Sequence, residues 1–176
     1  MGIIGMGTIG QDIAARARAF GMSIQYHNRS RLAAEKEGAA VYVDMDTLLS
    51  TSDVIVLALG YSPSAYHLLD TEQFAKMKKG VTIVNIARGK MIDEAALVAA
   101  IQDGTVWGAG LDVFDTEPTT NMELLKEHRL FLTPHMAAGT IETYIRMEKL
   151  AMKNLEASVT AGVPLNLVPE QSGVAF

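Results

Sequence analysis

The sequence predicts an α/β protein, a doubly wound parallel sheet in a single domain with a long C-terminal helix. Three observations predict it. Short apolar segments alternate with helical patterns along the chain, as in βαβ units whose strands are buried on both faces. The first apolar segment enters a glycine-rich turn that is followed directly by an apolar-periodic helix. The chain has 176 residues, of which 49% are hydrophobic, and this suits one domain with a sizeable core.

Six strands are expected, each from a short apolar segment, at residues 2–4, 23–27, 53–59, 81–85, 107–113 and 130–133. Helical patterns separate the first five of them, at residues 9–20, 46–50, 71–77 and 93–102. Glycines at 80 and 104 end the last two helices, because glycine accepts the left-handed conformation found after a helix. The pair Asp44 and Asp46 is interpreted as a helix start, and not as a cation site.

A final long helix is expected near residues 139–160, ending at Gly162 ahead of Pro164. We therefore expect a dinucleotide-binding domain over residues 1–163 and a C-terminal tail over 164–176. The apolar positions of this helix are explained by packing within the chain, and equally by pairing of two chains in a homodimer.

Composition excludes several classes of function. The chain has a net charge of -5, which argues against nucleic acid as a partner. It has no cysteine, so neither disulfides nor thiolate metal sites are expected, and His67 and His128 lack metal-ligand spacing with carboxylates. No apolar run reaches about 18 residues, and no basic segment precedes an apolar one at the N-terminus, so we expect no membrane contact and a cytoplasmic location.

Gly5, Gly7 and Gly10 form the pattern G-x-G-x-x-G between the first strand and the first helix. In a dinucleotide site the first glycine permits the turn, the second lets the backbone approach the pyrophosphate, and the third lets helix and strand pack closely. The N–H groups at the start of the helix, around Thr8 and Ile9, would then face the phosphates. Such turns also occur for packing alone, but the strand before and the helix after favour a Rossmann-like nucleotide site.

The end of the second strand bears on the choice of cofactor. In such folds an acidic residue about 20 positions after the glycine turn accepts hydrogen bonds from the adenosine ribose. Here the segment is Asn28-Arg29-Ser30-Arg31, which has no acid and two guanidinium groups. A 2′-phosphate would meet charge-assisted donors there, so NADP(H) is preferred and NAD(H) remains possible. The alternative interpretation is a solvated basic loop.

Three further motifs lie downstream, namely Asn85-Ile-Ala-Arg-Gly89, Gly110-Leu-Asp-Val-Phe-Asp-Thr-Glu-Pro118 and Thr133-Pro-His135. Together with the glycine turn they resemble the nucleotide-binding domain of the D-isomer-specific 2-hydroxyacid dehydrogenases. The resemblance extends from Gly2 to about Pro169 and is strongest to the glyoxylate and hydroxypyruvate reductase-like branch.

The resemblance implies a role for three side chains. Arg88 would hold the carboxylate of a 2-oxo acid, since a guanidinium grips a planar carboxylate with two donors. His135 would be the general acid that protonates the carbonyl oxygen during reduction, and Glu117 would hydrogen-bond its ring. Asp112 would receive the nicotinamide carboxamide. The other residues expected around that half of the cofactor are Leu59, Gly60, Ser62, Ile86 and Ala87.

Members of this family also carry a substrate domain, built mostly from residues that precede the glycine turn. This chain begins at the turn, so we expect an open site and no efficient turnover by the chain alone. Three functions stay open. The chain is the cofactor-binding half of an NAD(P)H-dependent reductase that converts a small 2-oxo acid to the D-2-hydroxy acid. Alternatively, it is a repurposed member that catalyses an isomerisation or cyclisation on a bulkier substrate, or a non-catalytic dinucleotide-binding interaction module.

Overall fold

The computed structural model describes residues 1–118 and 121–168. The chain divides into two compact units, Met1–His135 and a second one that begins at Met136. All strands of the described residues lie in the first unit. The expected domain boundary at residue 163 stays a prediction.

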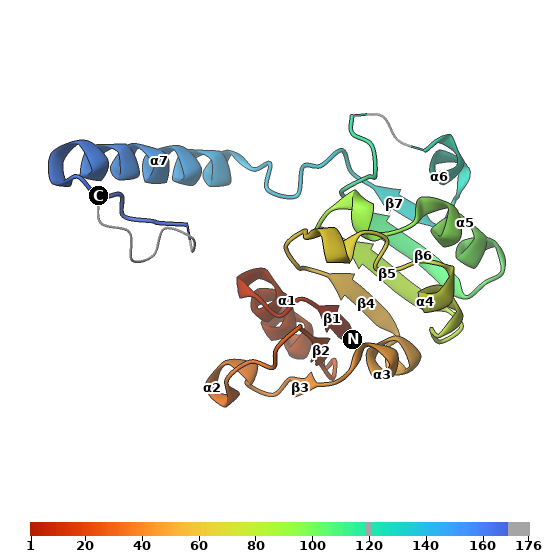
Figure 1. The fold of residues 1–176 in the computed structure, drawn as a ribbon. Helices are drawn as coiled ribbons and strands as arrows, with labels where there is room; N and C mark the ends of the chain where they lie inside the picture. The colour runs from red at the N-terminus through yellow and green to blue at the C-terminus, as the bar shows by residue number, and fades with distance from the viewer. Residues whose placement is uncertain (119–120, 169–176) are drawn as a thin grey trace. The chain divides into compact units, whose positions relative to one another are not determined.

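The first unit is built on one parallel sheet of seven strands, in the order β3-β2-β1-β4-β5-β6-β7 (Figure 1). The strands are β1 (Gly2–Ile4), β2 (Gln25–His27), β3 (Val41–Tyr42), β4 (Val54–Leu57), β5 (Val81–Asn85), β6 (Val106–Leu111) and β7 (Leu130–Leu132). The predicted fold class is confirmed, and so are the six predicted strands. Strand β3 was not predicted, because two residues are too few to produce a recognisable pattern.

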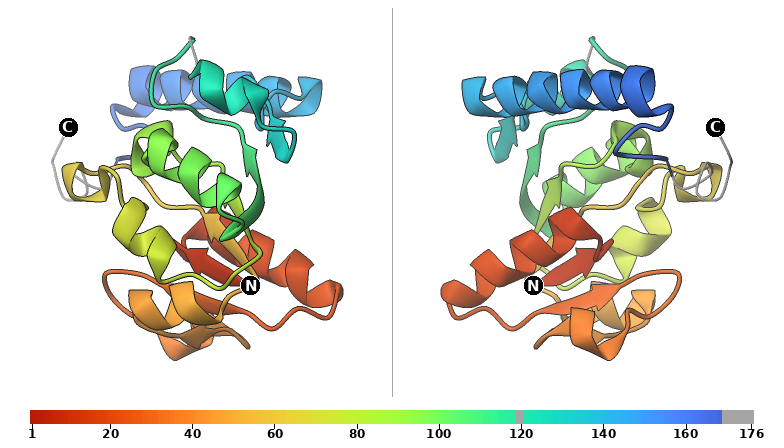
Figure 2. Two further views of the ribbon diagram at one scale, coloured as in Figure 1. Left: turned by 90° about the vertical axis from the view of Figure 1, so that its right-hand side faces the viewer. Right: turned by 90° about the vertical axis from the view of Figure 1, so that its left-hand side faces the viewer.

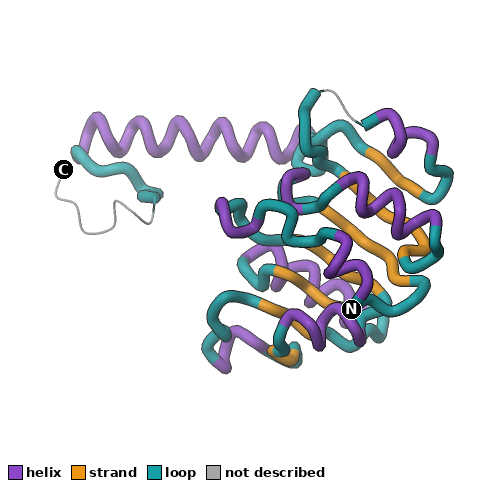
Figure 3. Tube along the Cα trace, turned by 45° about the vertical axis from the view of Figure 1, so that its right-hand side comes forward, coloured by secondary structure: helices purple, strands orange, loops and turns teal. Residues whose placement is uncertain are grey.

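Helices lie on both faces of this sheet. They are α1 (Thr8–Ala19), α2 (Ala34–Glu37), α3 (Met45–Thr51), α4 (Thr71–Ala75), α5 (Glu94–Gln102) and α6 (Met122–Lys126), with single 3₁₀ turns η1 (Pro63–Ala65) and η2 (Gly89–Met91). Figure 2 shows α1 on one side of the strands and the pair α4 and α5 on the other, and in Figure 3 the strands form a layer between helices. The arrangement is that of a doubly wound sheet.

Two apolar cores follow from this layering. Alternate residues of a strand point to opposite faces, so Ile3 packs with the α1 side chains Ala14 and Ala17, whereas Ile4 belongs to the other core. Ile4 and Ile83 are at most 2% exposed, and full burial of such a side chain contributes about 1.5–3 kcal/mol. The strand ends that carry the candidate site are therefore held by cores on both faces.

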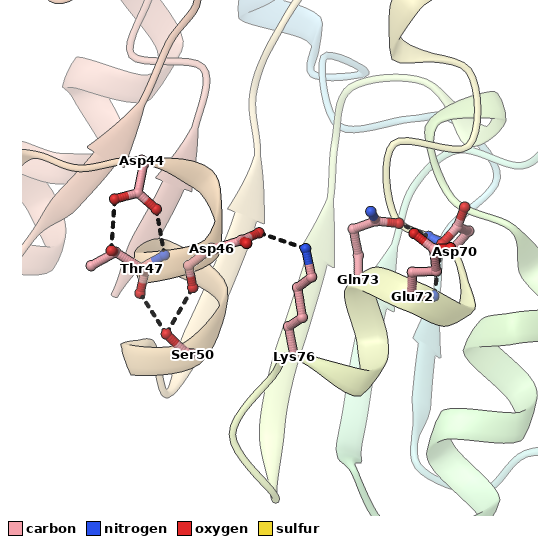
Figure 4. Close-up of polar contacts among 8 residues, drawn as sticks. All are labelled: Asp44, Asp46, Thr47, Ser50, Asp70, Glu72, Gln73 and Lys76. Carbon is pink, nitrogen blue, oxygen red and sulfur yellow. Dashed lines mark hydrogen bonds and ion pairs between the residues drawn. The ribbon is translucent and has the colours of Figure 1, made fainter.

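Aspartates cap the helices α3 and α4 (Figure 4). Asp44 Oδ1 accepts a hydrogen bond of 2.8 Å from the N–H of Thr47, which confirms the predicted helix start at α3. This bond holds the pKa of Asp44 below its usual range. Asp70 caps α4 in the same way, and Lys76 at the end of α4 donates to Asp46 of α3 at 2.8 Å. The caps satisfy N–H groups that a helix start leaves unpaired.

The second unit contains the predicted long helix, α7 (Ile141–Ala161). Thr140 caps its start, and Gly162 ends it in the left-handed conformation, with φ of 76°. Asn154 on α7 exchanges hydrogen bonds of 3.0 and 2.8 Å with Asn166, so the segment after the helix folds back along it. Over the described residues, neither α7 nor any other helix combines the length and apolar character needed to cross a lipid bilayer.

Candidate functional site

The glycine turn has the geometry of a phosphate cradle. Gly5 adopts φ of 99°, which side-chain-bearing residues rarely adopt, and a Cβ there would lie 2.6 Å from Leu59. A Cβ on Gly10 would lie 2.2 Å from the carbonyl oxygen of Gly5, so helix and strand pack directly against each other. A Cβ on Gly7 would meet nothing within 4 Å. Gly7 therefore borders open space at the place where a diphosphate would approach the backbone.

The start of α1 completes this cradle. Gly7 is the N-cap of α1, and because glycine has no side chain it makes no side-chain cap bond to the first turn. Thr8 and Ile9 are exposed at this end of the helix. The uncapped N–H groups and the positive end of the helix dipole form a site for an anion. The residues present thus fit the diphosphate of a dinucleotide.

Asn28 joins the second strand to the glycine turn. Its Oδ1 accepts a hydrogen bond of 2.7 Å from the backbone N–H of Met6, and its carbonyl oxygen accepts one of 3.2 Å from the hydroxyl of Tyr42. The preceding residue, His27, is also held in place, because its Nδ1 lies 3.0 Å from the carbonyl oxygen of Val43. Asn28 is therefore held at the strand end where the predicted adenosine ribose would bind.

The two arginines that follow Asn28 differ in their surroundings. Arg29 and Ser30 line a pocket of about 620 Å³ together with the glycine turn. Arg31 does not line it. Its Nε and Nη2 instead donate to the two carboxylate oxygens of Glu37, at 2.8 and 2.9 Å. Of the predicted phosphate-binding set, the structure brings Arg29 and Ser30 to the pocket and leaves the role of Arg31 untested.

The pocket extends from Asn28 and Arg29, where the adenosine is predicted to bind, along the carboxyl ends of β1 and β4. Predicted residues Leu59, Gly60 and Ser62 line it, and so does Tyr61, which was not predicted. Tyr61 also borders a second hollow of about 600 Å³, whose wall contains Arg88 and Glu117. The segment around Tyr61 therefore lies between the predicted cofactor and substrate positions.

The backbone of Arg88 is held in position by the side chain of Asn85, the last residue of β5. The side chain of Asn85 accepts a hydrogen bond of 3.0 Å from the N–H of Ala87 and donates one of 3.1 Å to the carbonyl oxygen of Arg88. Next along the chain, a Cβ on Gly89 would lie 1.8 Å from the backbone of Phe114. Glycine at 89 thus allows the segment that holds Arg88 to touch the segment that leads to Glu117.

Glu117 and His135 form a direct pair. His135 Nδ1 lies 2.7 Å from Glu117 Oε2, and Glu117 Oε1 accepts a hydrogen bond of 2.9 Å from the N–H of Phe114. These two bonds, with a smaller effect of the Arg88 charge, lower the pKa of Glu117. The carboxylate is therefore ionised at neutral pH and fixes the orientation of the imidazole ring.

Asp112 directly follows β6 and lies five positions before Glu117 in the chain. It is 6% exposed, and its Oδ1 accepts a hydrogen bond of 2.6 Å from the hydroxyl of Thr133. Ile86 and Ala87 line none of the three hollows described here, which are those around Arg29, Arg88 and His135. The predicted roles of Asp112, Ile86 and Ala87 at the nicotinamide stay predictions.

The structure brings Arg88, Glu117 and His135 to one end of the sheet. Glu117 borders both the hollow that contains Arg88 and an apolar one of about 470 Å³ that contains His135. A guanidinium, a carboxylate and an imidazole at adjoining surfaces can hold a carboxylate-bearing ligand and exchange a proton with it. Sequence reasoning missed Asn85, Tyr61 and Glu37. Only Asn85 had a signal, because it begins the motif that ends at Gly89.

The chain is also similar to known proteins. Residues 1–137 match the family model described as D-isomer specific 2-hydroxyacid dehydrogenase, NAD binding domain. Among curated proteins, the chain is 50% identical over 174 residues to 4-methyl-2-oxopentanoate reductase A of Aspergillus oryzae, covering 99% of this chain and 53% of the relative. It is 42% identical over 169 residues to a glyoxylate reductase of Thermococcus litoralis, covering 96% and 51%.

Solved structures of similar proteins have the same fold. A glyoxylate reductase from Paecilomyes thermophila superposes with a TM-score of 0.93 at 49% identity, over 97% of this chain and 52% of that one. An NADPH-dependent glyoxylate/hydroxypyruvate reductase of Sinorhizobium meliloti, in complex with NADP and malonate, superposes with a TM-score of 0.90 at 34% identity, over 96% and 52%. The chain spans about half the length of these relatives. The resemblance noted from the motifs is confirmed, and the chain belongs to the D-isomer specific 2-hydroxyacid dehydrogenase family, of which it contains the NAD-binding domain.

Proposed function

We propose that this chain is the cofactor-binding half of an NAD(P)H-dependent reductase that converts a small 2-oxo acid, of the glyoxylate or hydroxypyruvate type, to the D-2-hydroxy acid. The observation that carries the proposal is the 2.7 Å contact between His135 Nδ1 and Glu117 Oε2, at a surface that adjoins the guanidinium of Arg88. Relatives named as glyoxylate reductases support the substrate class.

Arg88 binds the substrate carboxylate in this proposal. A guanidinium stays protonated at all relevant pH values and presents paired donors to a planar carboxylate. Asn85 holds the backbone of Arg88 in place. The positive charge also polarises the neighbouring carbonyl of the substrate.

His135 supplies the proton. Glu117 accepts a hydrogen bond from the Nδ1–H of the ring, which leaves Nε2 as the atom that transfers a proton to the carbonyl oxygen. In the reverse direction Nε2 takes the proton from the hydroxyl. The bound nicotinamide supplies the hydride to the carbonyl carbon. Glu117 thus acts as a positioning residue for His135.

The cofactor binds along the carboxyl ends of the strands, where ligands bind in open α/β sheets. Gly7, Thr8 and Ile9 hold the diphosphate through backbone N–H groups. NADP(H) is preferred, because Arg29 and Ser30 line the pocket on the adenosine side and no acidic residue stands at position 28. The complex of the Sinorhizobium meliloti relative with NADP supports this preference.

The experiment is an assay of the purified chain with NADPH and either glyoxylate or hydroxypyruvate, followed by the absorbance of the reduced nicotinamide. We expect slow oxidation that is abolished in His135→Gln, and faster oxidation when the chain is fused behind the N-terminal half of the Aspergillus oryzae relative. Binding of NADPH without oxidation in either form would contradict the proposal and favour a non-catalytic or repurposed domain. Pairing of two chains through the long C-terminal helix, one of the two explanations for its apolar positions, is tested separately by the molar mass of the chain in solution.

A further inference from the structure

Glu37 is a carboxylate that the proposed chemistry does not use. It is the last residue of α2, and its side chain is 8% exposed. Its Oε1 accepts hydrogen bonds from Tyr26 Oη at 2.6 Å and from Arg31 Nε at 2.8 Å, and its Oε2 accepts one from Arg31 Nη2 at 2.9 Å. The bonds from Arg31 and Tyr26 lower the pKa of Glu37 to about 2. Glu37 is therefore charged throughout the physiological pH range.

Tyr26 fixes this carboxylate to the sheet. Tyr26 is the middle residue of β2 and is 0% exposed. Its hydroxyl donates to Glu37 and accepts a hydrogen bond of 3.0 Å from the N–H of Leu32, the residue after Arg31. The arrangement links the end of α2 to the segment that follows Asn28. Glu37 is thus fixed by its bond to the buried Tyr26, and it in turn fixes the guanidinium of Arg31.

The bond pattern on Arg31 is the fork-to-carboxylate geometry that a guanidinium also uses for phosphate. Two of its donors are already bound, and its charge is balanced at 2.8 Å by Glu37. Arg29 shares no ion pair within the described residues, and it lines the cofactor pocket while Arg31 does not. The charge of Arg31 is therefore neutralised by an ion pair, whereas that of Arg29 is not in the part of the chain that the structure describes. This difference is not visible in the sequence.

We propose that Glu37 is a specificity-determining residue for the cofactor, because it holds Arg31 in an ion pair and leaves Arg29 as the guanidinium that binds a ribose 2′-phosphate. This inference rests on the proposed cofactor function. The preference for NADP(H) over NAD(H) is then set by one guanidinium and weakened by the nearby carboxylate, because negative charge at Glu37 opposes the phosphate as well as neutralising Arg31.

The test replaces Glu37 by glutamine and measures the Kd values of NADPH and NADH by calorimetry. Glutamine keeps the size of the side chain and an oxygen that can accept from Tyr26, but it removes the charge. We expect Glu37→Gln to tighten NADPH by about three- to tenfold and to change NADH by less than about twofold, as loss of one opposing charge near a solvated site predicts. The double variant E37Q/R31Q should lose this gain.

Glu35→Gln is the matched control, because Glu35 is an exposed acid on the same helix with no ion pair among the described residues. It should leave both Kd values within about twofold. In the natural background, Arg31→Gln should weaken NADPH by less than about threefold and Arg29→Gln by more than about tenfold. Circular dichroism checks that each variant is folded, and the ratio of the two Kd values does not depend on the folded fraction.

Equal changes in NADPH and NADH on Glu37→Gln would show that Glu37 only supports the local structure, and would overturn the inference. So would an Arg31→Gln loss as large as that of Arg29→Gln. Both outcomes leave the proposed function intact, because the natural chain still binds the cofactor. Absence of binding of both dinucleotides to the natural chain would instead overturn the proposed function itself.

Discussion

His135 Nδ1 and Glu117 Oε2 lie 2.7 Å apart although the two residues are 18 positions apart in the chain. The contact joins the segment after β7 to the segment after β6, and these strands are neighbours in the sheet. Parallel strands place their carboxyl ends at one edge, so side chains that follow adjacent strands meet there. The pair is thus a direct consequence of the doubly wound topology.

Loss of the imidazole should raise the pKa of Glu117. The hydrogen bond from His135 is the main reason why the pKa of Glu117 lies below its ordinary value of 4.5. We expect His135→Ala to move the carboxyl titration of Glu117, followed by ¹³C NMR, upward toward 4.5. Since the folded pKa is the lower one, the pair stabilises the fold above the ordinary pKa, and this contribution disappears as the pH falls through the folded value. An unchanged titration would show that the bond does not form in solution.

Replacement of Arg88 should affect the substrate and not the cofactor. In the fused form of the enzyme, Arg88→Gln is expected to raise the KM for hydroxypyruvate about ten- to hundredfold, because a charge-assisted bidentate contact is lost. The Kd of NADPH should change by less than about twofold. Arg88→Lys keeps the charge and loses the fork, so it should recover only part of the affinity. A loss of NADPH binding equal to the rise in KM would place Arg88 at the cofactor instead.

Alanine at Gly10 should mainly reduce stability, whereas alanine at Gly7 should mainly reduce cofactor binding. Gly10→Ala places a Cβ 2.2 Å from the carbonyl oxygen of Gly5, so overpacking should destabilise the fold by about 1–3 kcal/mol. Gly7→Ala meets open space and should cost less than about 1 kcal/mol, the difference expected at an N-cap. It should nevertheless weaken NADPH more than about tenfold, because the methyl group occupies the position that the diphosphate approaches. Urea unfolding and calorimetry measure the two effects, and tight NADPH binding by Gly7→Ala would contradict the cradle.

Aspartate at position 28 should reverse the cofactor preference. In the natural chain, Asn28 Oδ1 accepts a hydrogen bond of 2.7 Å from the N–H of Met6. Asn28→Asp keeps an oxygen that can accept this bond. The new charge repels a 2′-phosphate and accepts hydrogen bonds from a ribose 2′-hydroxyl. We expect NADPH to weaken more than about tenfold while NADH binds as well or better. Parallel titrations of both dinucleotides check this, and a common loss for the two would indicate damage to the turn.

Much of the fold could be predicted because most of its strands are short apolar segments, and several of these, such as β1 and β5, lie next to a glycine. The helix starts at Asp44 and Asp93 also carry the acceptors that cap them. What escaped prediction was short. Strand β3 has two residues, α2 has four and α6 has five, and such segments contain less than two turns or alternations. Their formation depends on the sheet edge and on tertiary contacts.

The site was partly predictable for the same reason. Arg88, Glu117 and His135 lie within motifs that end strands, so their meeting follows from topology. The difference between Arg29 and Arg31 could not be foreseen, because it depends on Glu37, which reaches Arg31 only after the chain turns into α2. The sequence shows acids and bases in that segment, and only the folded backbone pairs them.

The central claim is that this chain binds a nicotinamide dinucleotide at the glycine turn. Isothermal titration calorimetry of the purified chain with NADPH tests it most directly. We predict saturable binding of one NADPH per chain that weakens in Gly7→Ala. The absence of any heat of binding with NADPH and with NADH, at concentrations well above those at which such domains saturate, would contradict the account.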